Sequence, residues 1–445
     1  MEGASLKREE FLKGLLLAKG RELGVKVGVT TGEPFWEMGQ VLLERQRAGL
    51  VSPFEAKDLE KRYRPELSLP GVQSIIAVAV PYNVLRSVPR GEAAEEGETA
   101  TAVPAPWWPS PPISLHALGE DYHRVVRAVL LELVSALQEP LENEGAQEPQ
   151  FLLQVDTGPL VEREVARRAG VGWIGSNASL FVPGFGSWVY LGLILTTLRL
   201  PADQPLQVWR KKAEYWHLEP ISKAALPNSW ADCRLCGRCV AACPTGALEQ
   251  PYQLNPARCL SQWTQVRGLV PEGYRRALGR RLYGCDTCQL ACPLNAALLT
   301  GTPASGPDSA FFLRQAFPSP VEILQLTDGQ FQRQFGSTAA GWRGRRVFQR
   351  NALIALGNEL AAASGPLGAP GQPAAVEQSL PGWLAVLLSY LDHPQAELRA
   401  HAAWALGQLR PTTVVVEALT KAEQQEEDET VRQEITKARL GGMAP

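Results

Sequence analysis

The 445-residue sequence lacks long apolar runs, a strong net charge and cysteines outside one short region. No apolar run reaches the roughly 20 residues that span a bilayer. The first residues contain neither the apolar core of a secretory signal nor a twin-arginine pair. We therefore expect a cytoplasmic protein without a membrane segment. The formal charge of −2 gives no broad basic field, so a nucleic-acid site would have to be a local patch.

The cysteines are confined to one segment: all eight lie between residues 233 and 292. Disulfide frameworks belong to short secreted chains, whereas clustered thiols in a long intracellular chain are typical of metal ligands. The first four, followed by Pro244, read C-x2-C-x2-C-x3-C-P. This is the spacing of bacterial ferredoxins, in which the fourth cysteine ligates the other of two [4Fe–4S] clusters.

The other four cysteines complete two clusters without remainder. We assign the ligands of the first cluster as Cys233, Cys236, Cys239 and Cys292, and those of the second as Cys243, Cys259, Cys285 and Cys288. The alternative is zinc, because zinc ribbons use two C-x2-C pairs. A ribbon would leave the additional cysteines and the two Cys-Pro pairs unexplained.

The length indicates two to four domains at roughly 150 residues per domain. We expect an α/β or α+β region at residues 1–225, a two-cluster ferredoxin-like region at 226–300 and a helical region at 301–445. A stretch rich in Pro, Ala and Glu at 87–112 is typical of a flexible insertion. Within the first region, apolar periodicity predicts helices over residues 5–50 with a first end near Gly24, strands at 69–83, 150–156 and 188–196, and helices at 121–137 and 162–168.

Two phrases in the helical region resemble each other. RNALIALGN at 350–358 and RAHAAWALGQL at 399–409 both place apolar residues at helical spacing and contain Leu-Gly. Their separation is close to the period of HEAT-type helical pairs if the Gly/Pro-rich stretch at 364–374 is an insertion. An ordinary helical domain is the alternative. The further helices are expected at 319–336, 344–362, 381–391, 395–409 and 412–440.

Longer motifs resemble those of the epoxyqueuosine reductase family. They are LPGVQSIIAVAVPYN, VDTGPLVEREVARRAGVGWIGSN, GSWVYLGLILT, ADCRLCGRCVAACPTGAL, RCLSQWTQVRGLVP, YGCDTCQLACPLN and RNALIALGN. The resemblance covers nearly the whole chain apart from 87–112 and parts of the C-terminal region. The ferredoxin motif alone occurs in many proteins, so the specific signal is its combination with the VDTGP…GWIG block.

The resemblance implies a fold, an activity and cofactors. Its members combine a cobalamin-binding α/β domain related to that of reductive dehalogenases with a ferredoxin-like domain and a HEAT-like helical domain. They use base-off cobalamin and two [4Fe–4S] clusters to reduce epoxyqueuosine to queuosine at the wobble position of tRNA. The D-x-H-x-x-G motif of other B12 proteins is absent, because no glycine follows Asp121 and His123 at the required place. The implied partners are a tRNA anticodon stem-loop and an electron donor such as ferredoxin or flavodoxin, and we expect a monomer.

The resemblance also implies roles for individual residues. Loss of the epoxide oxygen needs a positioned acid, and in the family this acid is the aspartate of VDTGP, here Asp156. A carboxylate after a buried strand is also a common helix cap, which for Asp156 would be the cap of helix 162–168. The implied cobalamin contacts are Arg62, Asn177, Ser179, Ser187, Ser261 and Asp286, each of which is also a common turn residue type.

Some positions depart from the family pattern. Ser176 stands where a lysine is usual, and Leu193 stands where a glutamate is frequent. Leu115 and His116 replace an arginine and a tyrosine. These changes affect local corrin or substrate contacts and leave the cysteines and Asp156 intact.

Arginine clusters are the candidate tRNA sites. The first contains Arg343, Arg345, Arg346 and Arg350, flanked by Trp342 and Phe348, and the second contains Arg275, Arg276, Arg280 and Arg281. Arginine beside aromatic residues suits phosphates and splayed bases, although a solvated helix face gives the same pattern. We expect the first cluster to bind tRNA.

Two other functions fit parts of the sequence. A corrinoid reductive dehalogenase would share the cofactors, but the export signal is missing and a helical C-terminal region is present. An electron-transfer module on a helical scaffold would share the cysteines, but it would not need the large region that precedes them.

Overall fold

The computed structural model describes residues 2–82, 111–141, 148–212, 215–221, 233–249, 251–295, 317–363, 381–409 and 411–441. The expected insertion at 87–112 lies outside these residues except at its last two positions. Within the described ranges, no helix is long and apolar enough to cross a membrane.

The chain forms two compact units. The first contains Met1–Val103, His116–Arg258 and Thr287–Arg314, and the second contains Pro104–Leu115, Cys259–Asp286 and Gln315–Pro445. The division into three domains stays a prediction, since residues 226–300 contribute to both units.

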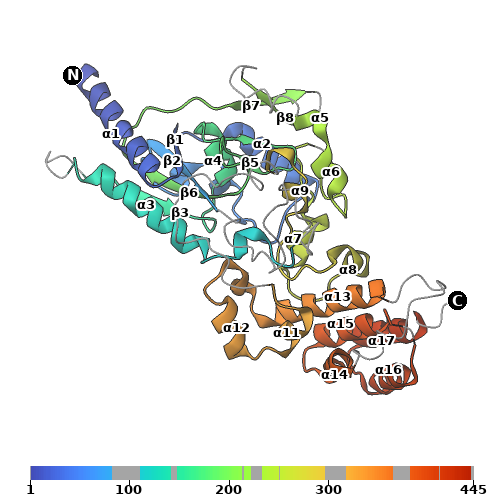
Figure 1. Cartoon of the computed structure of the whole chain (residues 1–445). Helices are drawn as coiled ribbons and strands as arrows, with labels where there is room; N and C mark the ends of the chain where they lie inside the picture. Colours follow the sequence, from blue (N-terminus) through green and yellow to red (C-terminus); the bar gives the residue numbers. More distant parts are fainter. Residues whose placement is uncertain are drawn as a thin grey trace, which may run out of the picture. The chain divides into compact units, whose positions relative to one another are not determined.

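A four-stranded sheet forms the centre of the first unit (Figure 1). Its strands are β1 (Lys26–Thr31), β2 (Ser74–Pro81), β6 (Val189–Thr196) and β3 (Phe151–Gln154), in the order β1-β2-β6-β3. All three pairings are antiparallel, with Val27 opposite Val78 and Ile76 opposite Ile194. Residues 74–80 of β2 are buried without alternation, because helices cover both faces of the sheet.

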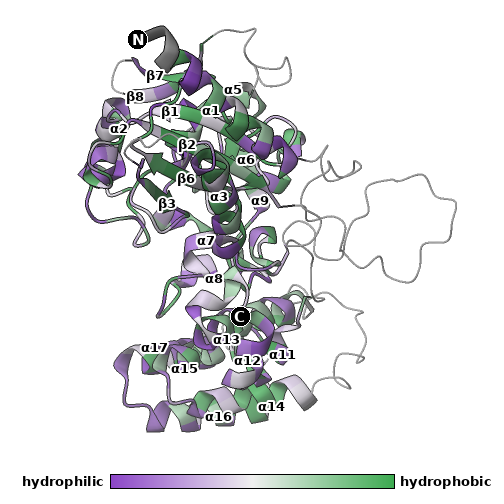
Figure 2. Cartoon of the chain, turned by 90° about the vertical axis from the view of Figure 1, so that its left-hand side faces the viewer, coloured by the Kyte–Doolittle hydropathy of each residue, from purple (hydrophilic) through white to green (hydrophobic). Residues whose placement is uncertain are grey.

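The helices of the first unit pack on the two faces of this sheet. Helices α1 (Glu2–Glu22) and α3 (Tyr122–Gln138) contact each other, and α3 covers β6 and β3. Gly192 allows this close approach, because a Cβ there would lie 2.5 Å from a methyl group of Val126. Helices α2 (Trp36–Arg47) and α4 (Glu162–Arg168) contribute apolar side chains to a core cluster on the other face. Figure 2 shows the strands of the sheet in the colours of apolar residues.

Short elements carry the remaining chain of the first unit and its cysteines. They are η1 (Glu60–Arg62), η2 (Pro65–Leu67), β4 (Trp173–Ile174), β5 (Leu180–Phe181), β7 (Gln207–Lys212), β8 (Tyr215–Pro220), α5 (Cys233–Cys236), α6 (Arg238–Ala242), η7 (Pro256–Arg258) and α9 (Thr287–Leu290). The turn η4 (Leu115–Ala117) contains a boundary between the units in the sequence: Leu115 belongs to the second unit, and the residues from His116 belong to the first. Strands β4 and β5 pair as a hairpin, as do β7 and β8.

The second unit is helical in its described residues. Its helices are α7 (Leu260–Trp263), α8 (Glu272–Leu278), α11 (Pro320–Gln325), α12 (Asp328–Phe335), η8 (Ala339–Arg343), α13 (Arg345–Ala363), α14 (Pro381–Ser389), η10 (Tyr390–Asp392), α15 (Ala396–Leu406), α16 (Thr413–Gln425) and α17 (Glu429–Gly441). Helix α15 packs between α13 and α17. A Cβ at Gly357 would lie 2.7 Å from the Trp404 ring, and one at Gly407 would lie 2.9 Å from Ala438. The glycine of each similar phrase therefore lets its helix approach the next one.

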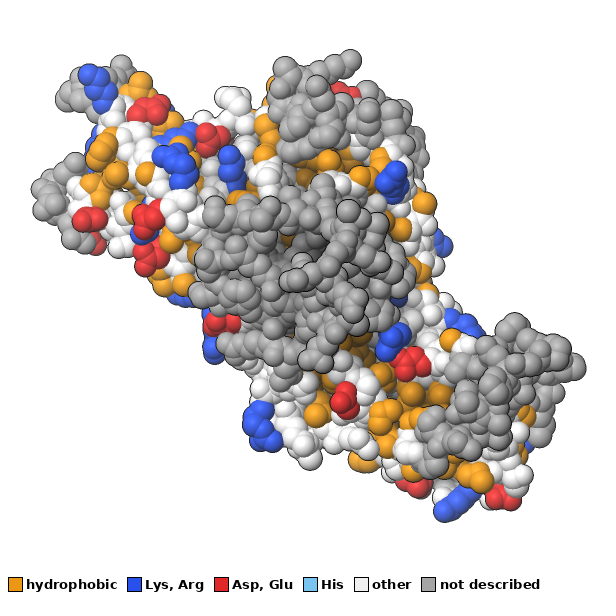
Figure 3. Space-filling view, viewed as in Figure 1, with side chains coloured by type: hydrophobic (Ala, Val, Ile, Leu, Met, Phe, Trp, Pro, Cys, Tyr) orange, Lys and Arg blue, Asp and Glu red, His pale blue; other side chains and the backbone are white. Residues whose placement is uncertain are grey.

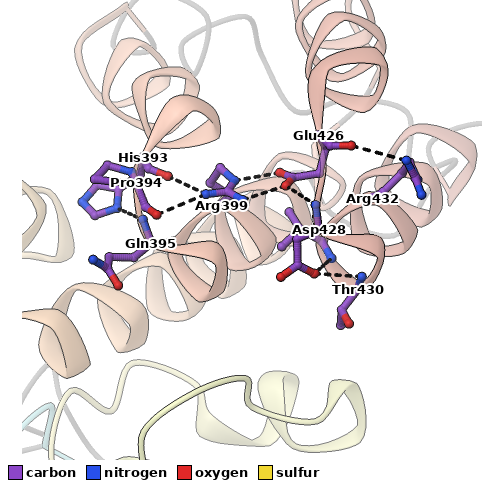
Figure 4. Close-up of polar contacts among 9 residues, drawn as sticks. His393, Pro394, Gln395, Arg399, Glu426, Asp428, Thr430 and Arg432 are labelled. Atoms are coloured by element: carbon purple, nitrogen blue, oxygen red, sulfur yellow. Dashed lines mark hydrogen bonds and ion pairs between the residues drawn. The ribbon is translucent and has the colours of Figure 1, made fainter.

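The helix expected at 412–440 is instead two helices with a turn between them. Glu426 ends α16, and both of its carboxylate oxygens accept hydrogen bonds from Arg399 at 2.7 and 2.6 Å. The same guanidinium donates to the carbonyls of His393 and Pro394 (Figure 4). One arginine of α15 thus fixes two turns at the same end of the helical layer.

Candidate active site

Asp156 lies in a tight turn after β3, within the first unit. Its backbone is left-handed, with φ of +56°, a conformation that aspartate tolerates better than most residues. The side chain is 63% exposed, and its Oδ2 accepts a hydrogen bond of 2.6 Å from the Tyr122 hydroxyl. The turn therefore presents this carboxylate to solvent with one phenolic donor beside it.

A histidine on α3 links Asp156 to a second carboxylate. Asp121 caps α3 by accepting from the His123 amide at 3.0 Å, and it also contacts His123 Nδ1 at 2.7 Å. His123 Nε2 lies 3.9 Å from Asp156 Oδ2. The imidazole ring is stacked on Tyr122 at a centroid distance of 4.3 Å. Tyr122 and His123 were not expected near Asp156 from the sequence; their position directly after Asp121, which caps the helix, was the available signal.

Asp156 does not cap α4, so the alternative structural role is wrong. The N-cap residue is Val161, which makes no side-chain cap. The hydrogen bond runs in the opposite sense: the Asp156 amide donates to Glu162 Oε1 at 2.7 Å. Burial, followed by repulsion from Asp156, raises the pKa of Glu162 to about 8. Glu162 thus holds the backbone of Asp156 through its carboxyl oxygen.

Two of the expected cobalamin contacts lie in the β4–β5 turn. Asn177 is buried, and its Oδ1 accepts from the Ser179 amide at 3.1 Å. Asn177 Nδ2 is also buried and has no partner among the described residues. Such a donor suits the carbonyl oxygen of a ligand amide.

The other two expected contacts of the first unit are held by protein groups. Arg62, at the end of η1, forms an ion pair with Glu55, and its carbonyl accepts from the Val161 amide. The buried Ser187 hydroxyl donates to Gln289 Oε1 at 2.7 Å and accepts from Asn295 Nδ2 at 2.8 Å. Ser187 therefore fastens the loop before β6 to the segment that carries the last cysteines.

The two remaining expected contacts belong to the second unit. Ser261 lies in α7, where its carbonyl accepts from Thr264 Oγ1 at 2.8 Å. Asp286 is almost fully buried and accepts from the Ser114 hydroxyl at 2.5 Å and the Leu115 amide at 2.7 Å. Its carboxylate thereby fixes the segment that contains one of the departures from the family pattern.

The four cysteines assigned to the first cluster belong to the first unit. Cys233 and Cys292 pack against the stacked rings of Trp173 and Phe181. Burial, followed by the neighbouring Cys233, raises the pKa of Cys239 to about 11. Burial also raises the pKa of Cys292, with smaller contributions from Cys233 and Cys236. These four thiols therefore lie close enough in space to affect one another's pKa, although Cys292 follows Cys233 by about 60 residues in the sequence.

The second assigned set is divided between the units. Cys243 and Cys288 lie in the first unit, where α6 and α9 pack together, and Cys259 and Cys285 lie in the second. Burial raises the pKa of Cys243, but hydrogen bonds from the amides of Thr245 and Ala247 outweigh it, so the pKa is lowered. Cys259 precedes α7, and the hydroxyl of Thr264, which ends α7, accepts from the Gly284 amide at 2.8 Å, directly before Cys285.

No three His, Cys, Asp or Glu side chains within the described ranges are arranged to hold a single metal ion.

The first arginine cluster is only partly on the surface. Arg343 lies over the ring of Trp342, which is 55% exposed, and donates to the Gln265 carbonyl at 2.6 Å. Arg345 pairs with Asp328 at 2.7 Å, and Arg346 pairs with Glu397. Figure 3 shows Lys and Arg side chains interspersed with Asp and Glu on the described parts of the face that it draws.

Arg350 is a correction to the expected tRNA site. It is 1% exposed, and it donates to the carbonyls of Trp263 at 2.7 Å and Gly268 at 3.1 Å and to that of Val266. A guanidinium saturated in this way cannot reach a phosphate. Burial lowers its pKa to about 9.

The second arginine cluster also has structural roles. Arg275 is buried and pairs with Glu434 through both terminal nitrogens at 2.7 and 2.9 Å. Arg281 is buried and donates to carbonyls of its own turn. Arg275 and Arg281 are therefore not available to RNA, whereas Arg276 and Arg280 are exposed.

Family comparisons match three parts of the chain. Residues 62–157 match "Epoxyqueuosine reductase QueG, DUF1730", residues 232–295 match "4Fe-4S double cluster binding domain", and residues 348–438 match "HEAT repeats". The expected two-cluster region and HEAT-like helices are thereby confirmed.

Relatives and solved structures cover almost the entire chain. Epoxyqueuosine reductase of Bacillus anthracis is 34% identical over 96% of this chain and 97% of its own length, and that of Bacillus subtilis is 33% identical over 96% and 95%. An epoxyqueuosine reductase solved with an epoxyqueuosine-modified tRNA-Tyr stem loop is 30% identical and superposes with a TM-score of 0.73 over 98% of this chain and 100% of that one. The chain therefore belongs to the epoxyqueuosine reductase family.

Proposed function

We propose that this protein reduces epoxyqueuosine to queuosine at the wobble position of tRNA. The observation that carries the proposal is 34% identity to an epoxyqueuosine reductase over 96% of the chain. A relative bound to a modified tRNA stem loop supports the substrate class. The reaction removes the epoxide oxygen as water and leaves an alkene, so each turnover consumes two electrons and two protons.

The residues present fit the proposed cofactors. The double-cluster region supplies eight cysteines for two [4Fe–4S] clusters, in the ligand sets assigned above. Cobalamin would lie against Arg62, Asn177, Ser179 and Ser187, where the buried Asn177 Nδ2 offers a donor to a corrin amide. Ser261 and Asp286 stay cobalamin contacts proposed from the family resemblance alone. When bound, cobalamin supplies a low-valent cobalt able to transfer electrons to the epoxide.

We propose Asp156 as the proton donor to the departing oxygen. A general acid must reach the reacting atom, and this carboxylate is exposed at a turn rather than engaged as a helix cap. Tyr122 orients one carboxylate oxygen, while Glu162 holds the backbone amide. His123 lies next to this carboxylate, with Nε2 3.9 Å from Asp156 Oδ2. In one relative from Bacillus subtilis, a catalytic loop named for an aspartate is swung out of the active site, which supports a movable position for the acid.

The tRNA would contact the surface at the start of α13. Arg343, Arg345 and Arg346 supply cations, and Trp342 supplies an exposed ring for stacking. Arg345 and Arg346 would exchange their carboxylate partners, Asp328 and Glu397, for phosphate only in part, which favours a modest contribution from each arginine.

The remaining parts of the proposal concern the cellular context. A ferredoxin or flavodoxin would deliver electrons one at a time, and the protein would act as a cytoplasmic monomer. The alternatives of a dehalogenase and of an electron-transfer module have no support comparable to the match along the whole chain.

The test is turnover by the anaerobically reconstituted protein. The purified chain, supplied with cobalamin and a low-potential reductant, should convert epoxyqueuosine-containing tRNA to queuosine-containing tRNA, detected by nucleoside mass spectrometry. Iron analysis should give about eight irons per chain, four for each cube. Fully loaded protein that leaves the epoxide intact would refute the proposed reaction.

The tRNA surface has a separate test. Replacing Arg345 and Arg346 by Ala should weaken tRNA binding and flatten its salt dependence by up to about two units, near 0.7–0.9 per lost phosphate contact. Arg432→Ala is a matched control, because Arg432 is also a surface arginine in an ion pair. Equal salt slopes for the double variant and the control would show that this surface does not bind the tRNA backbone.

A further inference from the structure

Ser176 is placed directly beside a proposed cluster ligand. It lies in the β4–β5 turn and is 3% exposed. Its amide lies 3.4 Å from Cys233 Sγ, and its hydroxyl oxygen lies 3.5 Å from the same sulfur and 3.2 Å from the Cys233 carbonyl oxygen. Two donors of one residue therefore converge on one cysteine.

The turn holds Ser176 in this position from both sides. The Gly175 amide donates to the Ser179 carbonyl at 2.9 Å, and the Ala178 amide donates to the Gly175 carbonyl at 2.9 Å. The Ser176 carbonyl accepts from the Tyr252 amide at 3.1 Å. The turn thus fixes the backbone of Ser176, and with it the contact of the Ser176 amide to Cys233.

The surroundings make a hydrogen bond to this sulfur effective. Trp173 and Phe181 pack against Cys233 and Cys292, so one side of the proposed first cluster is apolar. Electrostatic interactions are stronger in such an environment than in water. An iron-bound thiolate carries negative charge, which makes its sulfur a better acceptor than the neutral backbone carbonyl that competes for the same hydroxyl proton.

We propose that the Ser176 hydroxyl raises the reduction potential of the first cluster by donating a hydrogen bond to Cys233 Sγ. One-electron reduction adds a negative charge to the cube and its four thiolates, so a donor aimed at a ligand sulfur stabilises the reduced form more than the oxidised form. Hydrogen bonds to the sulfurs are among the factors that set cluster potentials. This inference rests on the proposed ligand set of the first cluster.

Ser176→Ala tests the hydroxyl alone, because the variant keeps the backbone amide. Ser176→Thr restores a hydroxyl. Thr245→Val is a matched control: the Thr245 hydroxyl lies 3.8 Å from Cys243 Sγ, but it donates its proton to the Arg258 carbonyl at 2.6 Å. The control thus removes a hydroxyl that lies farther from its ligand sulfur than the Ser176 hydroxyl does and that makes a much shorter hydrogen bond to a carbonyl, 2.6 Å against 3.2 Å.

The experiment is an anaerobic redox titration of the reconstituted full chain, followed by electron paramagnetic resonance with a dithionite-reduced mediator set. Ser176→Ala should lower one of the two midpoint potentials. The equilibrium constant for reduction of that cluster should fall by about threefold to tenfold, where tenfold corresponds to 59 mV for one electron. Ser176→Thr should recover most of this change, and Thr245→Val should leave both potentials in place.

Two outcomes separate the inference from its basis. Full iron content with an unchanged potential in Ser176→Ala, or an equal shift in Thr245→Val, would overturn the role of Ser176. Absence of iron–sulfur clusters from the wild-type protein would instead overturn the ligand assignment itself.

Discussion

Replacement of Arg350 by Met should destabilise α13 without directly affecting tRNA affinity. The substitution keeps an unbranched apolar stem and removes donors to the carbonyls of Trp263, Val266 and Gly268. A buried polar group left without a partner costs about 1–3 kcal/mol. Relief of a buried charge, visible in the pKa of about 9, offsets part of this loss. We expect a net loss of about 3 kcal/mol in local stability.

Hydrogen exchange read by mass spectrometry measures this loss locally, because the chain has two units and need not unfold in one step. Amides of α13 and of residues 263–268 should exchange faster by roughly two orders of magnitude, since about 1.4 kcal/mol is a factor of ten. Arg345→Met is the control: its partner Asp328 is 82% exposed, so the change should stay within about 1 kcal/mol. Unchanged exchange together with weakened tRNA binding would show that Arg350 contacts RNA after all.

Three further results are expected. Asp156→Asn, which tolerates the same backbone, should reduce turnover roughly a hundredfold or more while iron content and cobalamin binding are retained; a fully active variant would remove Asp156 from the mechanism. Cys292→Ala should disrupt the cluster held by Cys233, Cys236 and Cys239, and a spectrum that instead loses the other cluster would reverse the assignment. The pKa of Glu162 is about 8 in the folded protein against an ordinary 4.5, so the folded state binds this proton more tightly. The stability that this proton contributes is fully present below pH 4.5 and is lost as the pH rises through about 8. In urea unfolding, the stability of Glu162→Gln relative to wild type should therefore increase between pH 5 and pH 9. A difference in stability that stays constant with pH would contradict the raised pKa of Glu162.

Elements with strong local patterns were predictable from the sequence. Helix α4 has the predicted bounds of 162–168, and β2 and β6 lie within the predicted apolar runs. Strand β1 contradicts the helical expectation for residues 5–50. Its six residues between two helices form a strand because they pair with β2, a long-range contact that local periodicity does not reveal.

Burial explains the main difference at the candidate sites. Arg350 was grouped with its exposed neighbours because composition records charge but not orientation. Its position three residues after Val347 and four before Ile354, both buried, places it on the apolar face of α13. Asn351 likewise donates hydrogen bonds to the carbonyls of Thr264 and Leu282. The polar residues at the start of RNALIALGN therefore hold the backbone of neighbouring segments in place. Helical spacing would have signalled the orientation, but only the fold shows which carbonyls the side chains meet.

The left-handed backbone at Asp156 also limits how this enzyme could be altered. Aspartate, asparagine and glycine enter that conformation readily, whereas glutamate does so at a cost. Of the three residues that enter this conformation readily, only aspartate is an acid, so the shape of the turn and the proposed chemistry select the same amino acid independently. A search for variants with a longer acidic side chain would first have to rebuild the turn. Gly158 restricts even that route, because a Cβ there would lie 2.2 Å from the Gln154 side chain.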